Sequence, residues 1–217
     1  NLEFVMDPAR LETLLAPISP ERPGGADMSY SIEFDDIRRL RKSDDPALSQ
    51  GEWVREIRTP QWAKVRDLCE AILETRSKDL QVACWYLESM TQMEGFQGVC
   101  SGLELLEGLL ARYWNTESPA LFPADPEERI AKLEWLNNEI QIPMAINNIA
   151  MTSPGTGGYS RLRWEESRLV ENLGLHDPKA KEEAVAEGKL SGEAWDKAAG
   201  ASGSGFYTKL LGQIQEA

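Results

Sequence analysis

The sequence predicts an all-α fold, a compact multi-helix domain built around a central antiparallel helical hairpin. Residues 78–93 are apolar almost all round, so a helix there has to be buried on most sides. In residues 96–113, large apolar side chains recur every three or four positions, which is the spacing of one face of an α-helix. That face consists of Phe96, Val99, Leu103, Leu106, Leu110 and Tyr113. The short link at Glu94 and Gly95 favours antiparallel helices.

Three glycines fall on one side of the second hairpin helix, namely Gly95, Gly98 and Gly102. A glycine inside a helix lowers its stability by roughly 1 kcal/mol relative to alanine, so their presence needs an explanation from packing. We expect the backbone of a partner helix to approach this side too closely to leave room for Cβ atoms.

Three further helices are predicted before the hairpin. The first begins at the Asp-Pro pair of residues 7–8, an N-cap followed by proline in the first helical position. Residues 17–25 hold three prolines and two glycines and predict a loop, after which the second helix begins at Ser31. The third begins at the Thr-Pro pair of residues 59–60.

After the hairpin, the Asp-Pro pair of residues 125–126 predicts another helix start. Pro143 should break or kink that helix, because proline lacks the amide donor and clashes with the preceding turn. One more helix is predicted from Ser160 to about Asn172, with Gly174 as its C-terminal stop.

Composition divides the chain into four segments. Residues 1–6 (NLEFVM) show no pattern and are interpreted as a vector remnant that ends in a native methionine. Residues 7–174 form the predicted helical domain. Residues 175–205 are rich in Ala, Gly, Glu and Lys and predict a linker with short, weakly structured helices. Residues 206–217 begin an amphipathic helix that is cut short, so we expect the chain to belong to a longer protein.

The charge and cysteine content restrict the classes of partner and compartment. A net charge of −13 argues against binding to nucleic acid or to an anionic membrane surface, since both need a basic footprint. No apolar run approaches the roughly 20 residues of a membrane span, so no membrane insertion is expected. Cys69, Cys84 and Cys100 are an odd number and lie inside helical patterns, which indicates buried free thiols in a reducing cytoplasm.

A basic group near the end of the second predicted helix is the candidate partner-binding site. Arg38, Arg39 and Arg41 are expected to point outward there, and Trp53 follows in a polar loop. Arginine and tryptophan are typical anchors of protein interfaces, so these four residues predict a docking patch for an acidic partner. The alternative is a solvated helix end, where cations favour the helix dipole, with the tryptophan simply buried.

Few features of the sequence indicate catalysis. His176 is the single histidine, so a hydrolase with a Ser–His or Cys–His pair would have to use it or rely on surface carboxylates. Lys78 with Asp79 would need a cleft to act as an active site. The glycine cluster of residues 155–158 lacks the Lys-Ser/Thr pair of a phosphate-binding loop, so a flexible connection is favoured over a nucleotide site. No spacing matches a zinc or calcium site, and no catalytic residue, metal or cofactor is predicted.

Several sequence phrases, in order over residues 14–165, resemble the ImpA N-terminal family, the domain that opens TssA proteins of the bacterial type VI secretion system. They are LLAPISPERPGGADMSYSIEFDDIR from Leu14, DPALSQGEW from Asp45, TRSKDLQVACWYLE from Thr75, GFQGVCSGLELLEGLLARYW from Gly95, LFP from Leu121 and KLEWLN from Lys132.

This resemblance implies an all-helical, non-enzymatic module with no catalytic residues to carry over. It implies a cytoplasmic parent protein that helps to assemble or brace the baseplate and the contractile sheath and tube. Other secretion components would then be the partners. Self-association would be expected to use domains of the parent that are missing from this chain.

Overall fold

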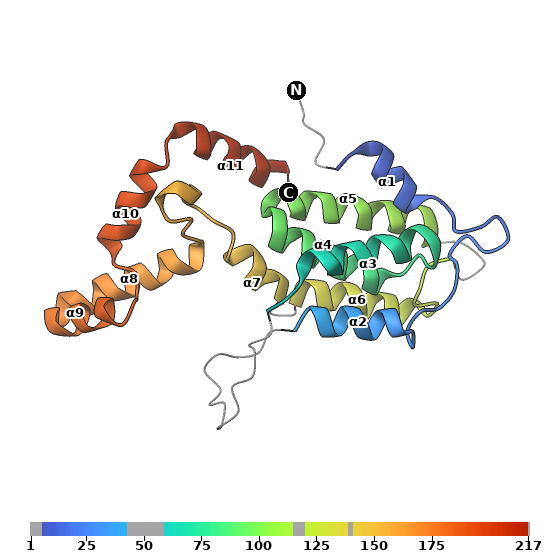
Figure 1. Cartoon of the computed structure of the whole chain (residues 1–217), viewed down its shortest axis with the longest axis horizontal. Coiled ribbons are helices and arrows are strands. Elements are labelled where there is room, and N and C mark those ends of the chain that lie inside the picture. Colours follow the sequence, from blue (N-terminus) through green and yellow to red (C-terminus); the bar gives the residue numbers. More distant parts are fainter. Residues whose placement is uncertain (1–5, 43–58, 115–119, 139–140, 217) are drawn as a thin grey trace, which may run out of the picture. The chain divides into compact units, whose positions relative to one another are not determined.

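The computed structural model describes residues 6–42, 59–114, 120–138 and 141–216. Over these ranges the protein is helical and has no β-strand, only isolated β-bridges, which confirms the predicted all-α class (Figure 1). The helices are α1 (Pro8–Leu15), α2 (Ile32–Leu40), α3 (Trp62–Thr75), α4 (Leu80–Glu94), α5 (Phe96–Tyr113), α6 (Pro126–Asn138), α7 (Gln141–Asn147), the 3-10 helix η1 (Pro154–Thr156), α8 (Arg161–His176), α9 (Pro178–Ala186), α10 (Gly192–Ala201) and α11 (Ser204–Glu216).

The chain packs as two compact units, Asn1–Glu139 and Ile140–Ala217, called here the first and the second unit. The predicted domain of residues 7–174 therefore covers the first unit together with α7 and most of α8. Its boundary at Gly174 falls inside α8, which continues to His176. The stability of residues 7–174 as one domain stays a prediction.

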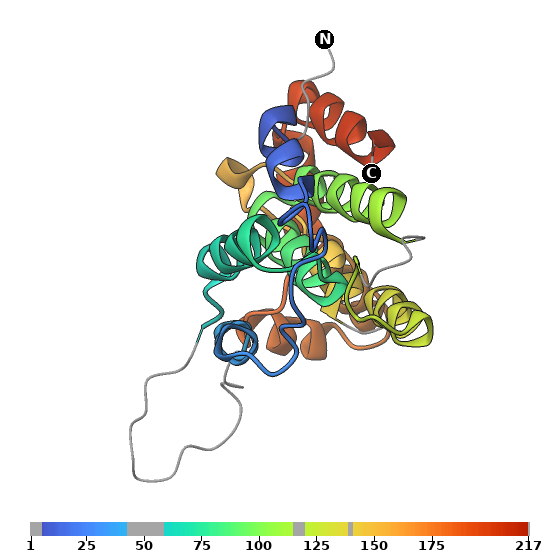
Figure 2. The ribbon, with the colours of Figure 1, turned by 90° about the vertical axis from the view of Figure 1, so that its right-hand side faces the viewer.

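The α4–α5 hairpin forms the centre of the first unit, as predicted. α4 packs against α5, α3 and α6, and Figure 2 shows α3 and α6 on opposite sides of it. Gly95 closes the turn with a positive φ of 64°, a conformation that favours glycine. The core draws fully buried side chains from five helices and one connecting segment: Leu14, Ile37, Val65, Leu80, Leu105 and Leu121.

The buried face of α5 differs from the predicted one. Val99, Leu106 and Tyr113 are buried as expected, but Leu103 is 37% exposed. Leu105 and Leu109 are fully buried instead. The reason is that α4 approaches the glycine side of α5, which turns the neighbouring leucine stripe toward the core and leaves Leu103 at its edge.

The expected close approach at Gly98 and Gly102 is confirmed. A Cβ atom on Gly98 would overlap the carbonyl group of Met90 and lie 2.9 Å from the amide nitrogen of Thr91. A Cβ atom on Gly102 would lie 2.7 Å from the Cα atom of Leu87. Both obstacles include backbone atoms of α4, so the two helices can pack at this distance only with glycine on α5.

The loop over residues 17–25 is tied to the hairpin through the chain before α4. The amide of Lys78 donates to the carbonyl of Gly24 at 2.8 Å, and the amide of Ala26 donates to the carbonyl of Arg76 at 3.0 Å. The segment before α6 is bound to the same stretch of chain, because the amide of Leu80 donates to the carbonyl of Phe122 at 2.8 Å. Three distant segments thus meet next to the start of α4.

Predicted helix starts agree with the structure where an aspartate precedes a proline. Asp7 and Asp125 each accept a hydrogen bond from an amide in the first turn of α1 and α6. Asp177 does the same for α9, within the segment where short helices were predicted. The predicted start at residues 59–60 is wrong by two residues, because α3 begins at Trp62 without a side-chain cap. Pro143 lies near the start of α7, and residues 139–140 between α6 and α7 lie outside the described residues, so the predicted break or kink stays a prediction.

The C-terminal part of the chain is helical, as predicted, but its helices are longer than expected. The glycine-rich stretch of residues 200–205 was predicted as a linker, yet α10 ends at Ala201 and α11 begins at Ser204. Gly203 makes the turn between them with φ 77°. The buried residues of the second unit include Val170, Ala184, Leu190, Ala198 and Leu210. That these helices are only weakly stable stays a prediction.

Candidate interaction surface

The orientation of α2 is fixed by its buried face. Ser31 caps the helix by accepting a hydrogen bond from the amide of Phe34 at 3.3 Å. Phe34 and Ile37 are buried, and the Phe34 ring lies edge-on to Trp85 of α4 with centroids 5.0 Å apart. The opposite side of α2 must therefore face solvent.

Two large side chains at the start of α2 are strongly exposed. Tyr30 is 101% exposed and Ile32 is 78% exposed. Among the large hydrophobic residues that the structure describes, only Leu175, at 79%, falls between these two values. The sequence reasoning missed both. A signal was present for Ile32, because it lies on the helix side away from Phe34 and Ile37 and so cannot share their core contacts.

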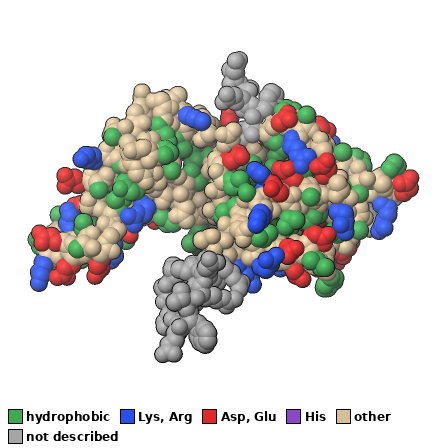
Figure 3. Space-filling view, in the orientation of Figure 1, with side chains coloured by type: hydrophobic (Ala, Val, Ile, Leu, Met, Phe, Trp, Pro, Cys, Tyr) green, Lys and Arg blue, Asp and Glu red, His purple; other side chains and the backbone are tan. Residues whose placement is uncertain are grey.

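Arg38 and Arg39 lie on the exposed side of α2, as predicted. Arg38 pairs with Asp35 at 3.0 Å, and Arg39 pairs with Asp36 at 2.7 Å. Their side chains are 49% and 64% exposed. Each arginine therefore stands beside an aspartate one turn earlier, and basic and acidic side chains lie side by side over α2 in Figure 3. This part of the surface is charge-balanced rather than basic.

Arg41 does not point outward, which corrects the prediction for this residue. Its guanidinium pairs with Glu88 of α4, and their side chains are only 13% and 3% exposed. It also lies over the rings of Trp85 and Trp135, with centroid distances of 5.6 and 5.5 Å. The physical reason is that a carboxylate buried in α4 needs a cation. Glu88, a carboxylate in the middle of a mostly buried helix, was the sequence signal for this pair.

The α2 surface is defined here as Tyr30, Ile32, Arg38 and Arg39. Trp53, the fourth predicted site residue, lies outside the described residues. Partner binding by the predicted arginines stays a prediction, and the structure adds the two apolar residues beside them.

Lys78 and Asp79 serve the fold. The Lys78 ammonium group is buried and donates to the carbonyls of Leu14 and Leu73. Burial lowers the pKa of Lys78 to about 8. Asp79 caps α4 by accepting hydrogen bonds from the amides of Gln81 and Val82, and burial raises the pKa of Asp79 to about 7. Both side chains are enclosed, so neither faces a cleft.

The other residues considered for catalysis or ligand binding are His176 and the glycine-rich segment of residues 155–158. His176 is exposed at the end of α8, and its ring has no hydrogen bond to any described serine or cysteine. The predicted flexible glycine segment is a loop closed by hydrogen bonds from Met151 and Thr152 to the carbonyl of Tyr159. Among the described residues, no group of His, Cys, Asp or Glu could hold a metal ion. Within the same ranges, no helix has the length and hydropathy of a membrane span.

The three cysteines are free and buried, as the sequence indicated. Burial raises the pKa of Cys84 to about 12 and the pKa of Cys69 well above its ordinary value. Both thiols therefore stay protonated at neutral pH and pack as small hydrophobic groups.

Comparison with known proteins assigns similarity to most of the chain. Residues 15–138 match the family described as ImpA, N-terminal, type VI secretion system. The type VI secretion system component TssA1 of Pseudomonas aeruginosa is 32% identical over 131 residues, which cover 60% of this chain and 38% of that protein. The chain therefore spans well under half the length of this relative.

A solved structure is similar over the whole chain. It is the N-terminal domain, including the conserved ImpA_N region, of the TssA component of the type VI secretion system from Burkholderia cenocepacia. The TM-score is 0.79 and the sequence identity is 30%, with 100% of this chain and 80% of that chain covered. The similarity thus includes the second unit as well as the matched family region.

Proposed function

The chain belongs to the ImpA N-terminal family of the type VI secretion system, and we propose that it acts there as a non-enzymatic adaptor module. In this proposal it helps to assemble the baseplate and the contractile sheath or tube in the cytoplasm through protein–protein contacts. Self-association would use other parts of a longer parent protein. The proposal is supported by the relatives, which are named as components of this secretion system.

The main structural support for the adaptor role is the exposure of the α2 surface. An exposed tyrosine beside an exposed isoleucine is unfavourable for a free surface and favourable for an interface, where aromatic side chains often dominate the binding energy. Arg38 and Arg39 lie about two helical turns beyond Ile32, near the C-terminal end of α2. Their aspartate partners also make the surface suitable for a partner with mixed charges, which fixes the docking register.

The use of polar groups inside the first unit supports the same conclusion. Lys78, Asp79 and the Arg41–Glu88 pair are all engaged in holding helices together. Arg129 does the same, because its guanidinium donates to the carbonyls of Trp114, Leu121 and Pro123. These buried charged groups therefore have structural partners.

The test replaces Tyr30 and Ile32 by serine in the full-length parent protein. We expect loss of secretion and loss of binding to a baseplate, sheath or tube protein, because the apolar anchors are removed without touching the core. The matched control is Met93→Ser with Ile130→Ser, which changes two residues of the first unit that are 40% and 48% exposed. Wild-type secretion and binding by a folded Tyr30/Ile32 variant would place the binding surface elsewhere.

The two arginines are tested separately by Arg38→Glu with Arg39→Glu. Arg41 is left unchanged, because its replacement would leave Glu88 buried without a cation and would report on folding instead of binding. We expect slower association with the partner and a weaker dependence of the association rate on salt. An unchanged association rate would mean that the two arginines serve only contacts within the first unit, namely their aspartate pairs and the Phe34 and Trp85 rings beneath Arg38.

A further inference from the structure

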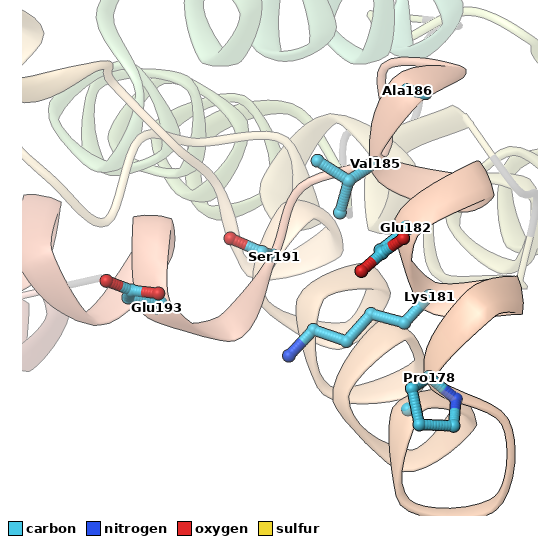
Figure 4. Close-up of a pocket in the computed structure, with 8 residues that line it drawn as sticks. Pro178, Lys181, Glu182, Val185, Ala186, Ser191 and Glu193 are labelled. Atoms are coloured by element: carbon cyan, nitrogen blue, oxygen red, sulfur yellow. The ribbon is translucent and has the colours of Figure 1, made fainter.

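The second unit carries a cleft that the secretion role does not account for. It has a volume of about 680 Å³ and lies between the end of α8, one side of α9 and the start of α10 (Figure 4). Lys181, Glu182 and Val185 point into it from α9, and Glu193 lies across from them on α10. Pro178, Glu182 and Val185 recur at three- and four-residue spacing, so they form one stripe of α9 along the cleft.

The walls of this cleft are tied together by Glu171 of α8. One of its carboxylate oxygens pairs with the Lys181 ammonium group at 2.7 Å, and the other accepts a hydrogen bond from the amide of Gly192 at 2.9 Å. Gly174 permits this arrangement, because a Cβ atom there would lie 2.5 Å from Cδ of Lys181. The single carboxylate thus connects α8 to α9 and to the first residue of α10.

The lining combines exposed apolar groups with negative charge. Val185 is 42% exposed, and Pro178 is exposed two turns earlier on the same side of α9. Glu182 and Glu193 are exposed on the two walls, and neither forms an ion pair with a described residue. The lysine of the lining is already bound to Glu171. The cleft therefore presents two exposed apolar side chains of α9, with one carboxylate between them and a second across the cleft on α10.

The surroundings of the cleft are also rich in exposed apolar residues. Among the described residues, nine of the fourteen exposed large hydrophobic side chains belong to the second unit, which is about a third of the chain. Leu173 and Leu175, close to the cleft in sequence, are 40% and 79% exposed. Hydrophobic side chains gather over α8 and α10 in Figure 3. Concentrations of this kind mark protein interaction sites.

We propose that this cleft docks a segment of a partner protein that carries lysine or arginine next to a large apolar side chain. The long aliphatic part of a basic side chain can lie along Val185 or Pro178 while its charged end reaches Glu182 or Glu193. The two carboxylates favour a basic segment over an acidic one. The exposed side chains of Val185 and Pro178 favour a segment that also buries a hydrophobic group. The proposal rests on residues of the second unit alone and does not depend on the α2 surface.

The test uses phage-displayed random twelve-residue peptides, selected on the full chain at low salt. We expect enriched peptides to carry lysine or arginine near a leucine, methionine or aromatic residue. Their affinity is measured by fluorescence anisotropy. Glu182→Gln with Glu193→Gln should weaken binding roughly 2- to 30-fold, the range for the loss of two exposed charge pairs. The matched control, Glu187→Gln with Glu216→Gln, removes the same charge from exposed positions outside the lining and should change binding by less than about twofold.

Mapping the binding site completes the test. Backbone amide shifts on peptide addition should concentrate in residues 174–193, and Val185→Ser should weaken binding while the fold, followed by circular dichroism, stays intact. The proposal is overturned if no peptide is enriched, if enriched peptides lack basic residues, or if the glutamine pair binds them as wild type does. It is equally overturned if sedimentation shows a dimer that the glutamine pair abolishes, because the occupant would then be a second copy of this chain.

Discussion

Replacing Gly98 by alanine should destabilise the first unit, although alanine is the better helix former. The new methyl group would overlap the carbonyl of Met90 and approach the amide of Thr91 to 2.9 Å. Overpacking of this kind costs about 1–3 kcal/mol, and a backbone obstacle that cannot rotate away places Gly98 at the upper end. The gain in helix propensity offsets roughly 1 kcal/mol. The expected net loss in the free energy of unfolding is about 2 kcal/mol.

A graded series makes this reasoning testable. Gly102→Ala meets the Cα atom of Leu87 at 2.7 Å together with its mobile side chain, so we expect a net loss of about 1 kcal/mol. Gly108→Ala meets only side-chain carbons of Leu15, which can move, so its effect should be near zero. Gly212→Ala meets nothing within 4 Å and should stabilise its helix by up to about 1 kcal/mol.

The measurement is urea unfolding followed by circular dichroism and tryptophan fluorescence. Leucine in place of Gly98 or Gly102 should lower the midpoint further than alanine does, because the larger side chain needs more space. A higher midpoint for Gly98→Ala or Gly102→Ala than for wild type would refute the close approach of α4 and α5. Equal effects at Gly98, Gly102 and Gly212 would refute the argument that packing, and not helix propensity, decides the outcome.

Three further predictions follow from the same contacts. Arg41→Ala should lower the free energy of unfolding by about 3–5 kcal/mol, because it leaves the Glu88 carboxylate buried without a cation. The control, Arg39→Ala, removes an exposed pair and should change that free energy by less than about 1 kcal/mol. Urea unfolding compares the two variants, and equal losses would contradict the buried pair. The pKa of Asp79 is raised to about 7, so this group stabilises the fold at acidic pH, and its contribution is lost as pH rises through 7. Asp79→Asn keeps a capping side chain but cannot ionise. The free energy of unfolding of this variant, minus that of wild type, should therefore increase between pH 4.5 and pH 8. A difference that does not change with pH would contradict the argument that burial raises the pKa of Asp79. Truncation after His176 should leave the thermal unfolding of the first unit nearly unchanged, and a drop of more than a few degrees would show that α9–α11 support it.

Local sequence was sufficient for the helical elements and for many of their ends. The hairpin of α4 and α5 is visible in the apolar periodicity, and Gly95 marks its turn. Aspartate before proline marks the start of α1, α6 and α9, because the capping hydrogen bond and the fixed φ angle of proline are properties of neighbouring residues. The order of short sequence phrases was also enough to indicate the ImpA N-terminal family, which the comparisons confirm.

Local sequence was insufficient to decide which side of α5 is buried. The stripes through Leu103 and through Leu105 have almost the same spacing, and both are apolar. Only the position of α4 against Gly98 and Gly102 selects between them. Gly174 is a similar case, because it reads as a helix stop but lies inside α8, where it leaves room for the Lys181 side chain.

The candidate interaction surface was also predicted only in part from the sequence. Composition placed arginines near the end of α2, and Arg38 and Arg39 are exposed there, but Arg41 turns inward to Glu88. The exposure of Tyr30 became visible only with the tertiary structure. Helix formation and capping depend on hydrogen bonds between residues within about four positions, which the sequence contains. Burial of one side and exposure of another depend on helices that are distant in the chain, and only the folded structure brings those together.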